Sequence, residues 1–131
     1  MPRPGKKAIL LVDHGSKLGE ANDMLAQVAA LVARESPEHV VEVSHMEISE
    51  PTIAQGFDAC VAAGASDVTV HPYMLSPGRH ATRDIPRLVA AAARRHPGVL
   101  YRVTEPLGLH EMLARVVVER VKTAQTAEDR R

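Results

Sequence analysis

The sequence has few aromatic residues, a single cysteine and no excess of charge of either sign. Its 131 residues include no Trp, one Phe and two Tyr, so the core must be aliphatic and stacking on nucleic-acid bases is disfavoured. Sixteen basic and sixteen acidic residues cancel, which leaves no overall field to attract DNA or an anionic membrane. The lone Cys60 excludes an intramolecular disulfide and a cysteine-rich zinc site.

Long hydrophobic runs are also missing. The N-terminal "MPRPGKK" leads into "AILLV", which is far shorter than a membrane span, and no signal-peptide cleavage pattern follows it. We therefore expect a cytoplasmic protein. The length suits one domain, which we place at residues 1–123, followed by a polar and disordered C-terminal tail at residues 124–131.

Four short apolar runs alternate with helical patterns along the chain. The expected strands are 7–13, 39–46, 67–74 and 99–105, and the expected helices lie within 21–36, 50–64, 84–98 and 109–122. This order predicts an α/β fold, a three-layer sandwich in which helices flank a four-stranded parallel sheet with flavodoxin-like topology. Ligands of such sheets bind at the carboxyl ends of the strands.

Seven histidines are the unusual feature of the composition, because neutral imidazoles bind metals and carry protons. His14 follows the first expected strand in "DHGSK", where Gly15 lets the backbone turn sharply and approach a ligand. Ser16 is a candidate hydrogen-bond partner for an anionic group. The motif is short, and an ordinary loop in which Ser16 or Asn22 caps the next helix explains it equally well.

The second expected strand ends in "HMEISEPTI", which places Glu47 at the same edge of the sheet. A carboxylate there also favours the N-terminus of the helix that follows. His45, one residue before Met46, is expected to face the other side of the strand and to have no role in the site. His71, within the third strand, is expected to pack or hydrogen-bond inside the sheet.

The third strand leads into "VTVHPYMLSPGRHATRDIP", residues 68–86. Because Pro86 does not fit a helix interior, we expect the third helix to begin within a turn before it, with Asp84 as the N-cap. His80 then lies on the loop, held at the rim by Pro77 and Gly78. Arg79 and the helix N-terminus beside it favour an anion.

A divalent transition metal would be held in an incomplete coordination shell by two imidazoles and a carboxylate from neighbouring strand ends, those of His14, His80 and Glu47. A structural zinc is normally closed by four protein ligands, so an open shell suits transient metal delivery. Polar groups suited to a polycarboxylate surround it: Ser16, Lys17, Ser76, Arg79 and Arg83. Coincidence among seven histidines is the alternative explanation.

At these residues the sequence resembles the small sirohydrochlorin chelatases, class II tetrapyrrole chelatases of cobalamin and sirohaem synthesis. The matching motifs are "DHGSK", "MEISEPTI", "PYMLSPGRHATRDIP" and "EPLGLHEML", in this order from about Ala8 to Val121. The resemblance implies a chelatase-like fold and insertion of Co²⁺, or of Fe²⁺ or Ni²⁺, into sirohydrochlorin. It implies no tightly bound cofactor, since the metal is a substrate.

The resemblance also implies roles for individual residues. His14 and His80 become the metal ligands and catalytic residues, with His14 as proton acceptor. The implied substrate-binding residues are Glu47, Ser16, Leu75, Ser76, Pro77, Gly78 and Arg79. Lys17 stands where an Arg is common, which keeps the charge but loses bidentate carboxylate binding. The resemblance is to one half of longer two-domain chelatases, so we expect a homodimer that covers both faces of the flat macrocycle.

Two alternatives remain open at the level of sequence. A phosphocarrier domain of the sugar phosphotransferase type would be phosphorylated on His14, but it leaves His80 and Glu47 without a role. A non-catalytic module that binds a metal or a tetrapyrrole would use the same residues as the chelatase.

Overall fold

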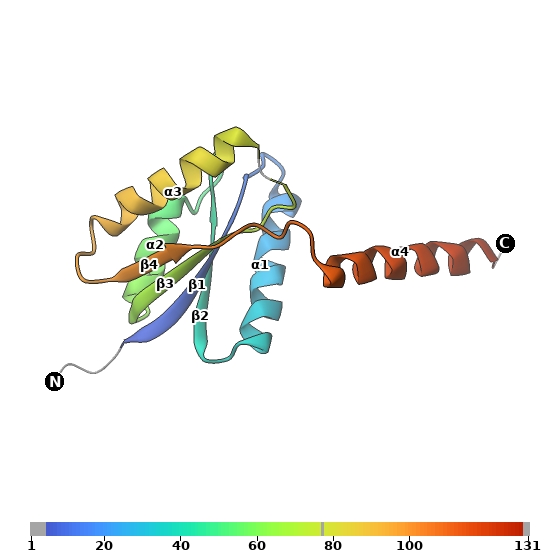
Figure 1. The fold of residues 1–131 in the computed structure, drawn as a ribbon, viewed down its shortest axis with the longest axis horizontal. Coiled ribbons are helices and arrows are strands. Elements are labelled where there is room, and N and C mark those ends of the chain that lie inside the picture. Colours follow the sequence, from blue (N-terminus) through green and yellow to red (C-terminus); the bar gives the residue numbers. More distant parts are fainter. Residues whose placement is uncertain (1–4, 77, 130–131) are drawn as a thin grey trace.

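The computed structural model describes residues 5–76 and 78–129, and its eight elements alternate between strand and helix (Figure 1). In chain order they are β1 (Lys6–Asp13), α1 (Gly19–Glu35), β2 (His39–His45), α2 (Ile53–Ala62), β3 (Ala65–Pro72), α3 (Arg79–Ala93), β4 (Leu100–Val103) and α4 (Glu111–Asp129). The predicted α/β class is confirmed.

All neighbouring strands are parallel, and their order across the sheet is β2-β1-β3-β4. The chain order reverses between β1 and β3, so the connections from these two strands leave in opposite directions. This is the point at which open α/β sheets form a ligand-binding crevice. The flavodoxin-like topology thus places the loops after β1 and β3 on either side of one crevice.

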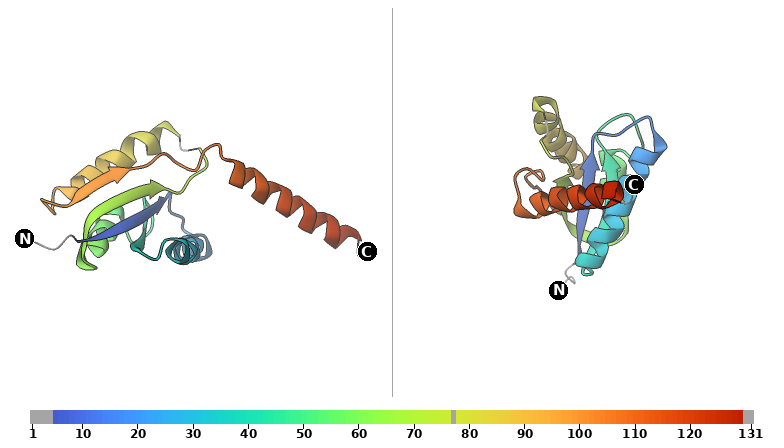
Figure 2. Two further views of the ribbon diagram at one scale, coloured as in Figure 1. Left: turned by 60° about the horizontal axis from the view of Figure 1, so that its bottom comes forward. Right: turned by 90° about the vertical axis from the view of Figure 1, so that its right-hand side faces the viewer.

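Different helices pack on the two faces of the sheet. Helices α2 and α3 pack on one face, whereas α1 alone packs on the other and lies over β2 and β1 (Figure 2). The larger core is aliphatic apart from Phe57 and Cys60, and its largest buried side chains include Leu10, Val12, Phe57, Val68, Val70, Ile85 and Val89. The smaller core under α1 centres on Leu11, Leu25 and Ala29.

Helix α3 begins earlier than the sequence predicts. Its N-cap is Gly78, Pro86 lies inside it, and Asp84 is a buried residue of the helix and not its cap. The reason is burial: Ala81, Ile85 and Val89 recur at helical spacing and are all in the core. Burying this stripe offsets the roughly 3 kcal/mol that an interior proline costs a helix. The prediction that His80 lies on a loop is therefore wrong, because His80 is in the first turn of α3.

Helix α4 departs from the layers. It extends to Asp129, beyond the predicted end at Lys122, and points away from the sheet (Figures 1 and 2). Among the described residues it makes no substantial contact with any other element. The division into a domain at residues 1–123 and a tail at 124–131 stays a prediction. Within residues 5–76 and 78–129, no helix is both long and apolar enough to cross a membrane.

Helix α2 approaches the sheet most closely at Gly56. A Cβ atom there would lie 2.7 Å from Leu10 Cδ1, 2.9 Å from Ser44 Cβ and 3.0 Å from the Val43 carbonyl oxygen. The contacts come from a fully buried leucine and from strand backbone, neither of which can move away easily. Gly56 therefore sets the distance between α2 and the sheet.

We expect Gly56→Ala to lower the free energy of unfolding by about 1–3 kcal/mol, the usual cost of overpacking a core. Urea denaturation followed by circular dichroism measures this. The matched control is Gly19→Ala in α1, where a Cβ would meet nothing within 4 Å. The control should leave stability unchanged or slightly higher. Equal losses in the two variants would contradict the close-approach explanation.

Candidate functional site

An open pocket lies at the carboxyl edge of the sheet, where β1 and β3 run side by side. His14 and Ser16 line it from the loop after β1, and Tyr73, Leu75 and Ser76 line it from the segment after β3. The remaining lining residues are Asp13, Gly15, Ala21, Met24 and Met74. The topology thus brings together side chains that are about sixty positions apart in the sequence, as predicted for this edge.

Close packing of two loop backbones fixes the position of His14. The Glu47 amide donates to the His14 carbonyl oxygen at 3.2 Å, and the Met46 amide donates to the Asp13 carbonyl oxygen at 2.8 Å. Gly15 has φ +91°, and a Cβ there would overlap the carbonyl oxygen of Glu47. Glycine is therefore required on both steric and conformational grounds. The side chain of His14 is left exposed beside the pocket.

A carboxylate–imidazole pair, in which the imidazole is buried and the carboxylate partly exposed, supports this loop. His45 is 2% exposed, and its Nδ1 lies 2.5 Å from Asp13 Oδ1, which also accepts the Gly15 amide at 3.0 Å. The sequence predicted no role in the site for His45, but the structure shows that it is buried and supports the loop, and sequence reasoning missed Asp13 as its partner. A signal was present, because the two residues end neighbouring strands and face each other in the parallel register.

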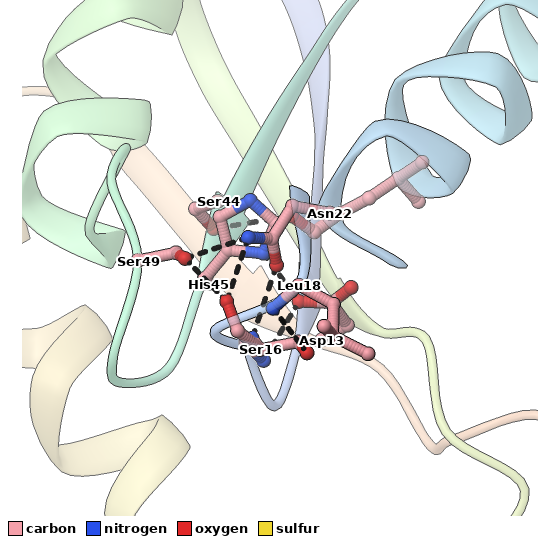
Figure 3. A network of polar contacts seen from close by, with 9 residues as sticks. Asp13, Ser16, Leu18, Asn22, Ser44, His45 and Ser49 are labelled. Atoms are coloured by element: carbon pink, nitrogen blue, oxygen red, sulfur yellow. Dashed lines mark hydrogen bonds and ion pairs between the residues drawn. The ribbon is translucent and has the colours of Figure 1, made fainter. Parts of the chain in front are cut away.

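Asn22 links the loops after β1 and β2 (Figure 3). Its Oδ1 accepts the Ser16 amide at 3.0 Å, and its Nδ2 donates to the Ser16 carbonyl oxygen at 2.8 Å and to Ser49 Oγ at 2.7 Å. The Ser16 hydroxyl accepts the amide of Leu18 at 3.0 Å. The N-cap of α1 is Leu18, without a side-chain cap, so Ser16 and Asn22 stabilise the loop and do not cap the helix.

His80 carries a carboxylate partner of its own. Its Nε2 lies 2.9 Å from Asp84 Oδ2, one turn further along α3, while Arg83 Nε and Arg87 Nη2 approach Asp84 Oδ1 at 3.2 and 3.4 Å. Burial raises the pKa of the Asp84 carboxyl, but the hydrogen bond from Arg83 and the charges of His80 and Arg83 outweigh it and hold this pKa below its usual value. Asp84 therefore stays charged and orients His80, whose Nδ1 is left for another partner.

The structure groups the predicted site residues in two sets along one edge. His14, Ser16, Leu75 and Ser76 line the pocket, and Glu47 adjoins it through its backbone contact with His14. Gly78, Arg79 and His80 lie at the start of α3, outside the pocket lining. Pro77 lies outside the described residues. In the described part of the chain, no three His, Cys, Asp or Glu side chains form a cluster able to hold a metal.

Large apolar side chains surround this edge, and sequence reasoning identified only Leu75 among them. Each loop that follows a strand exposes one: Leu18 is 71% exposed, Ile48 63%, Leu75 65% and Leu109 fully. Ile48 has φ 75°, a conformation that β-branched residues rarely adopt. We call these four residues the apolar rim. The sequence did contain a signal for this apolar rim, because large aliphatic residues stand among polar residues in these loops.

Comparison with known proteins gives a consistent result. The CbiX family model matches residues 8–124. The chloroplastic sirohydrochlorin ferrochelatase of Arabidopsis thaliana is 43% identical over 114 residues, covering 87% of this chain and 51% of the plant protein. The sirohydrochlorin cobaltochelatase of Methanosarcina barkeri is 32% identical, covering 91% of this chain and 97% of the archaeal protein.

A solved structure shares the fold. The sirohydrochlorin chelatase SirB from Bacillus subtilis subspecies spizizenii, in complex with cobalt, superposes with a TM-score of 0.82 at 37% identity, over 90% of this chain and 50% of SirB. This chain thus spans about half the length of the plant and Bacillus proteins. With the family model matched over most of its length and the fold of a solved relative, the chain belongs to the CbiX family.

Proposed function

We propose that this protein is a sirohydrochlorin chelatase, an enzyme that inserts a divalent metal ion into sirohydrochlorin. The observation that carries the proposal is the exposed imidazole of His14 in an open pocket whose wall includes Met24, Tyr73 and Leu75. Binding of a flat macrocycle requires an apolar surface, and metal insertion requires a metal-binding group beside that surface. This pocket offers candidates for both. The relatives named above, a sirohydrochlorin ferrochelatase and a sirohydrochlorin cobaltochelatase, support the same reaction.

His14 and His80 are the proposed metal ligands and catalytic residues. Two neutral imidazoles leave coordination positions vacant for the nitrogens of the incoming macrocycle. Insertion of the ion displaces two protons from pyrrole N–H groups. His14 is the proposed acceptor of one of them, since imidazole exchanges protons near neutral pH, and the other would leave to water in the open pocket. His80, with Nε2 held by Asp84, would bind the ion through Nδ1.

The proposed substrate contacts divide by chemistry. The apolar rim would contact the face of the macrocycle. Arg79 and the N-terminus of α3 at Gly78 would attract the carboxylates of the substrate. Ser16, Glu47, Ser76 and Pro77 complete the proposed binding set.

The metal is proposed as a substrate, with no tightly bound cofactor. Co²⁺ is our first choice and Fe²⁺ or Ni²⁺ the others, because imidazole accepts all three. Both iron and cobalt appear in the names of relatives.

A homodimer and a cytoplasmic location complete the proposal. One rim reaches one face of a planar ring, so a second copy would cover the other face. The phosphocarrier alternative finds no support in the comparisons.

We expect His14→Ala and His80→Ala each to reduce cobalt insertion at least about 100-fold, because each removes a proposed ligand and general acid–base catalysis alone contributes about that much. The readout is the absorption spectrum of metallated sirohydrochlorin, with circular dichroism to verify folding. His39→Ala, at the amino end of β2, is the control and should keep full activity. Full activity in both site variants would refute the proposed roles.

We expect Asp84→Asn to weaken Co²⁺ binding by about tenfold, the usual effect of losing the carboxylate that orients a metal-binding histidine. Titration of Co²⁺ followed by its visible absorption measures the affinity. Asp58→Asn is the matched control, because Asp58 Oδ1 also lies 2.6 Å from a histidine nitrogen, His96 Nε2. Asp58 is in α2 and His96 follows the carboxyl end of α3, away from the N-terminus of α3. An unchanged affinity in Asp84→Asn would show that His80 needs no such orientation or binds no metal.

A further inference from the structure

Four exposed arginines recur on one side of α3, at intervals of four, four and seven residues that all return to the same side of a helix. We call them the arginine row: Arg79, Arg83, Arg87 and the C-cap Arg94. The opposite side of α3 is the one buried in the core, through Ala81, Ile85 and Val89. The row therefore faces solvent along the whole helix, over a length of about 22 Å at 1.5 Å per residue.

A single carboxylate offsets part of the charge of the arginine row. Asp84 Oδ1 accepts from Arg83 Nε at 3.2 Å and from Arg87 Nη2 at 3.4 Å, and Asp84 is the only acidic residue in the sequence from 79 to 96. Arg95 does not add to the charge of the row, because Asp58 pairs with it. Four arginines and one aspartate leave a formal charge of +3 on the exposed side of α3.

The other side of the carboxyl edge has the opposite charge. The loops after β1 and β2 and the start of α1 expose four carboxylates and one cation, which are Glu20, Asp23, Glu47, Glu50 and Lys17. Four carboxylates and one lysine give a formal charge of −3. The whole chain has a net charge of zero, so the contrast arises from the placement of charges and not from an excess of one sign. An anion that approaches this edge is attracted from the side of α3 and repelled from the side of α1.

The arginine row begins beside the candidate site and leads away from it. Arg79 follows the N-cap of α3 and precedes His80, and Leu75 and Ser76, just before this helix, line the pocket that also contains His14. From there α3 runs toward the amino edge of the sheet (Figure 1). The last member, Arg94, lies about 22 Å along the helix from the first. At this distance it acts on a molecule in the pocket through its electric field and not through contact.

We propose that the arginine row steers a polycarboxylate macrocycle to the pocket and so increases its rate of association. Guanidinium groups pair well with carboxylates, whereas α3 offers no aromatic side chain on which a nucleic-acid base could stack. The inference rests on the proposed function, because the carboxylates of sirohydrochlorin supply the negative charge. It gives Arg94 a role that requires no contact with the bound substrate and no step of metal insertion.

The test compares two charge reversals, Arg94→Glu and Arg34→Glu. Both arginines are exposed at the carboxyl end of a helix that runs to the amino edge of the sheet, Arg94 in α3 and Arg34 in α1. Both substitutions change the net charge of the chain by the same amount, but only Arg94 belongs to the arginine row. Stopped-flow mixing with metal-free sirohydrochlorin, followed by the fluorescence of the macrocycle, gives the association and dissociation rate constants. Circular dichroism verifies that each variant is folded.

At an ionic strength of about 10 mM, where the Debye length is about 30 Å, we expect Arg94→Glu to lower the association rate constant at least about threefold relative to Arg34→Glu. The dissociation rate constant should stay the same, since a steering charge acts on the encounter and not on the bound complex. Arg94→Lys should keep the wild-type rate constants, because steering depends on charge and not on the geometry of the guanidinium group. At about 1 M salt, where the Debye length is about 3 Å, the difference should vanish.

Three outcomes would overturn the inference. Equal association rate constants in Arg94→Glu and Arg34→Glu at low salt would mean that only the net charge matters or that the arginine row serves another anion. A faster dissociation with unchanged association would make Arg94 a direct contact of the substrate. A wild-type protein that binds no sirohydrochlorin would refute the proposed function as well, whereas the first two outcomes would leave the proposed function intact.

Discussion

The site depends on the close approach of two loop backbones at Gly15 and Glu47. Only a residue without Cβ, in a left-handed conformation, fits against the Glu47 carbonyl, and this contact locks the loops after β1 and β2 together. The Asp13 carboxylate holds the same turn through the Gly15 amide and is itself held by buried His45. His14 therefore projects from a rigid backbone into solvent, as its proposed role as a metal ligand requires.

The two exposed histidines at this edge are held in position by different contacts. His14 is positioned by backbone contacts, whereas His80 is positioned through its side chain by Asp84, which two arginines keep charged. The apolar rim adds large aliphatic side chains to this edge, and their exposure to water is unfavourable. An edge that combines exposed imidazoles with exposed aliphatic groups suits a metal and a flat organic ring meeting at one place.

Predictions from sequence succeeded where the pattern is local or periodic. Alternating apolar runs and helical patterns located all four strands and four helices, and the parallel topology placed His14, Ser16, Leu75 and Ser76 on one pocket. The start of α3 was misplaced because Pro86 is a strong local signal against a helix interior, whereas the burial of Ala81 and Ile85 that overrides it is a tertiary effect. The same limit explains why the partners of His45 and His80 were missed.

By itself, the sequence determined the order of the elements, the aliphatic character of the core and which residues stand at strand ends, because these follow from spacing along the chain. Only the tertiary structure decided that Asp13 contacts His45, that His80 lies inside α3 next to Asp84, and that α4 points away from the sheet. These features arise from contacts between segments distant in sequence, where burial and hydrogen bonding through space outweigh local preference.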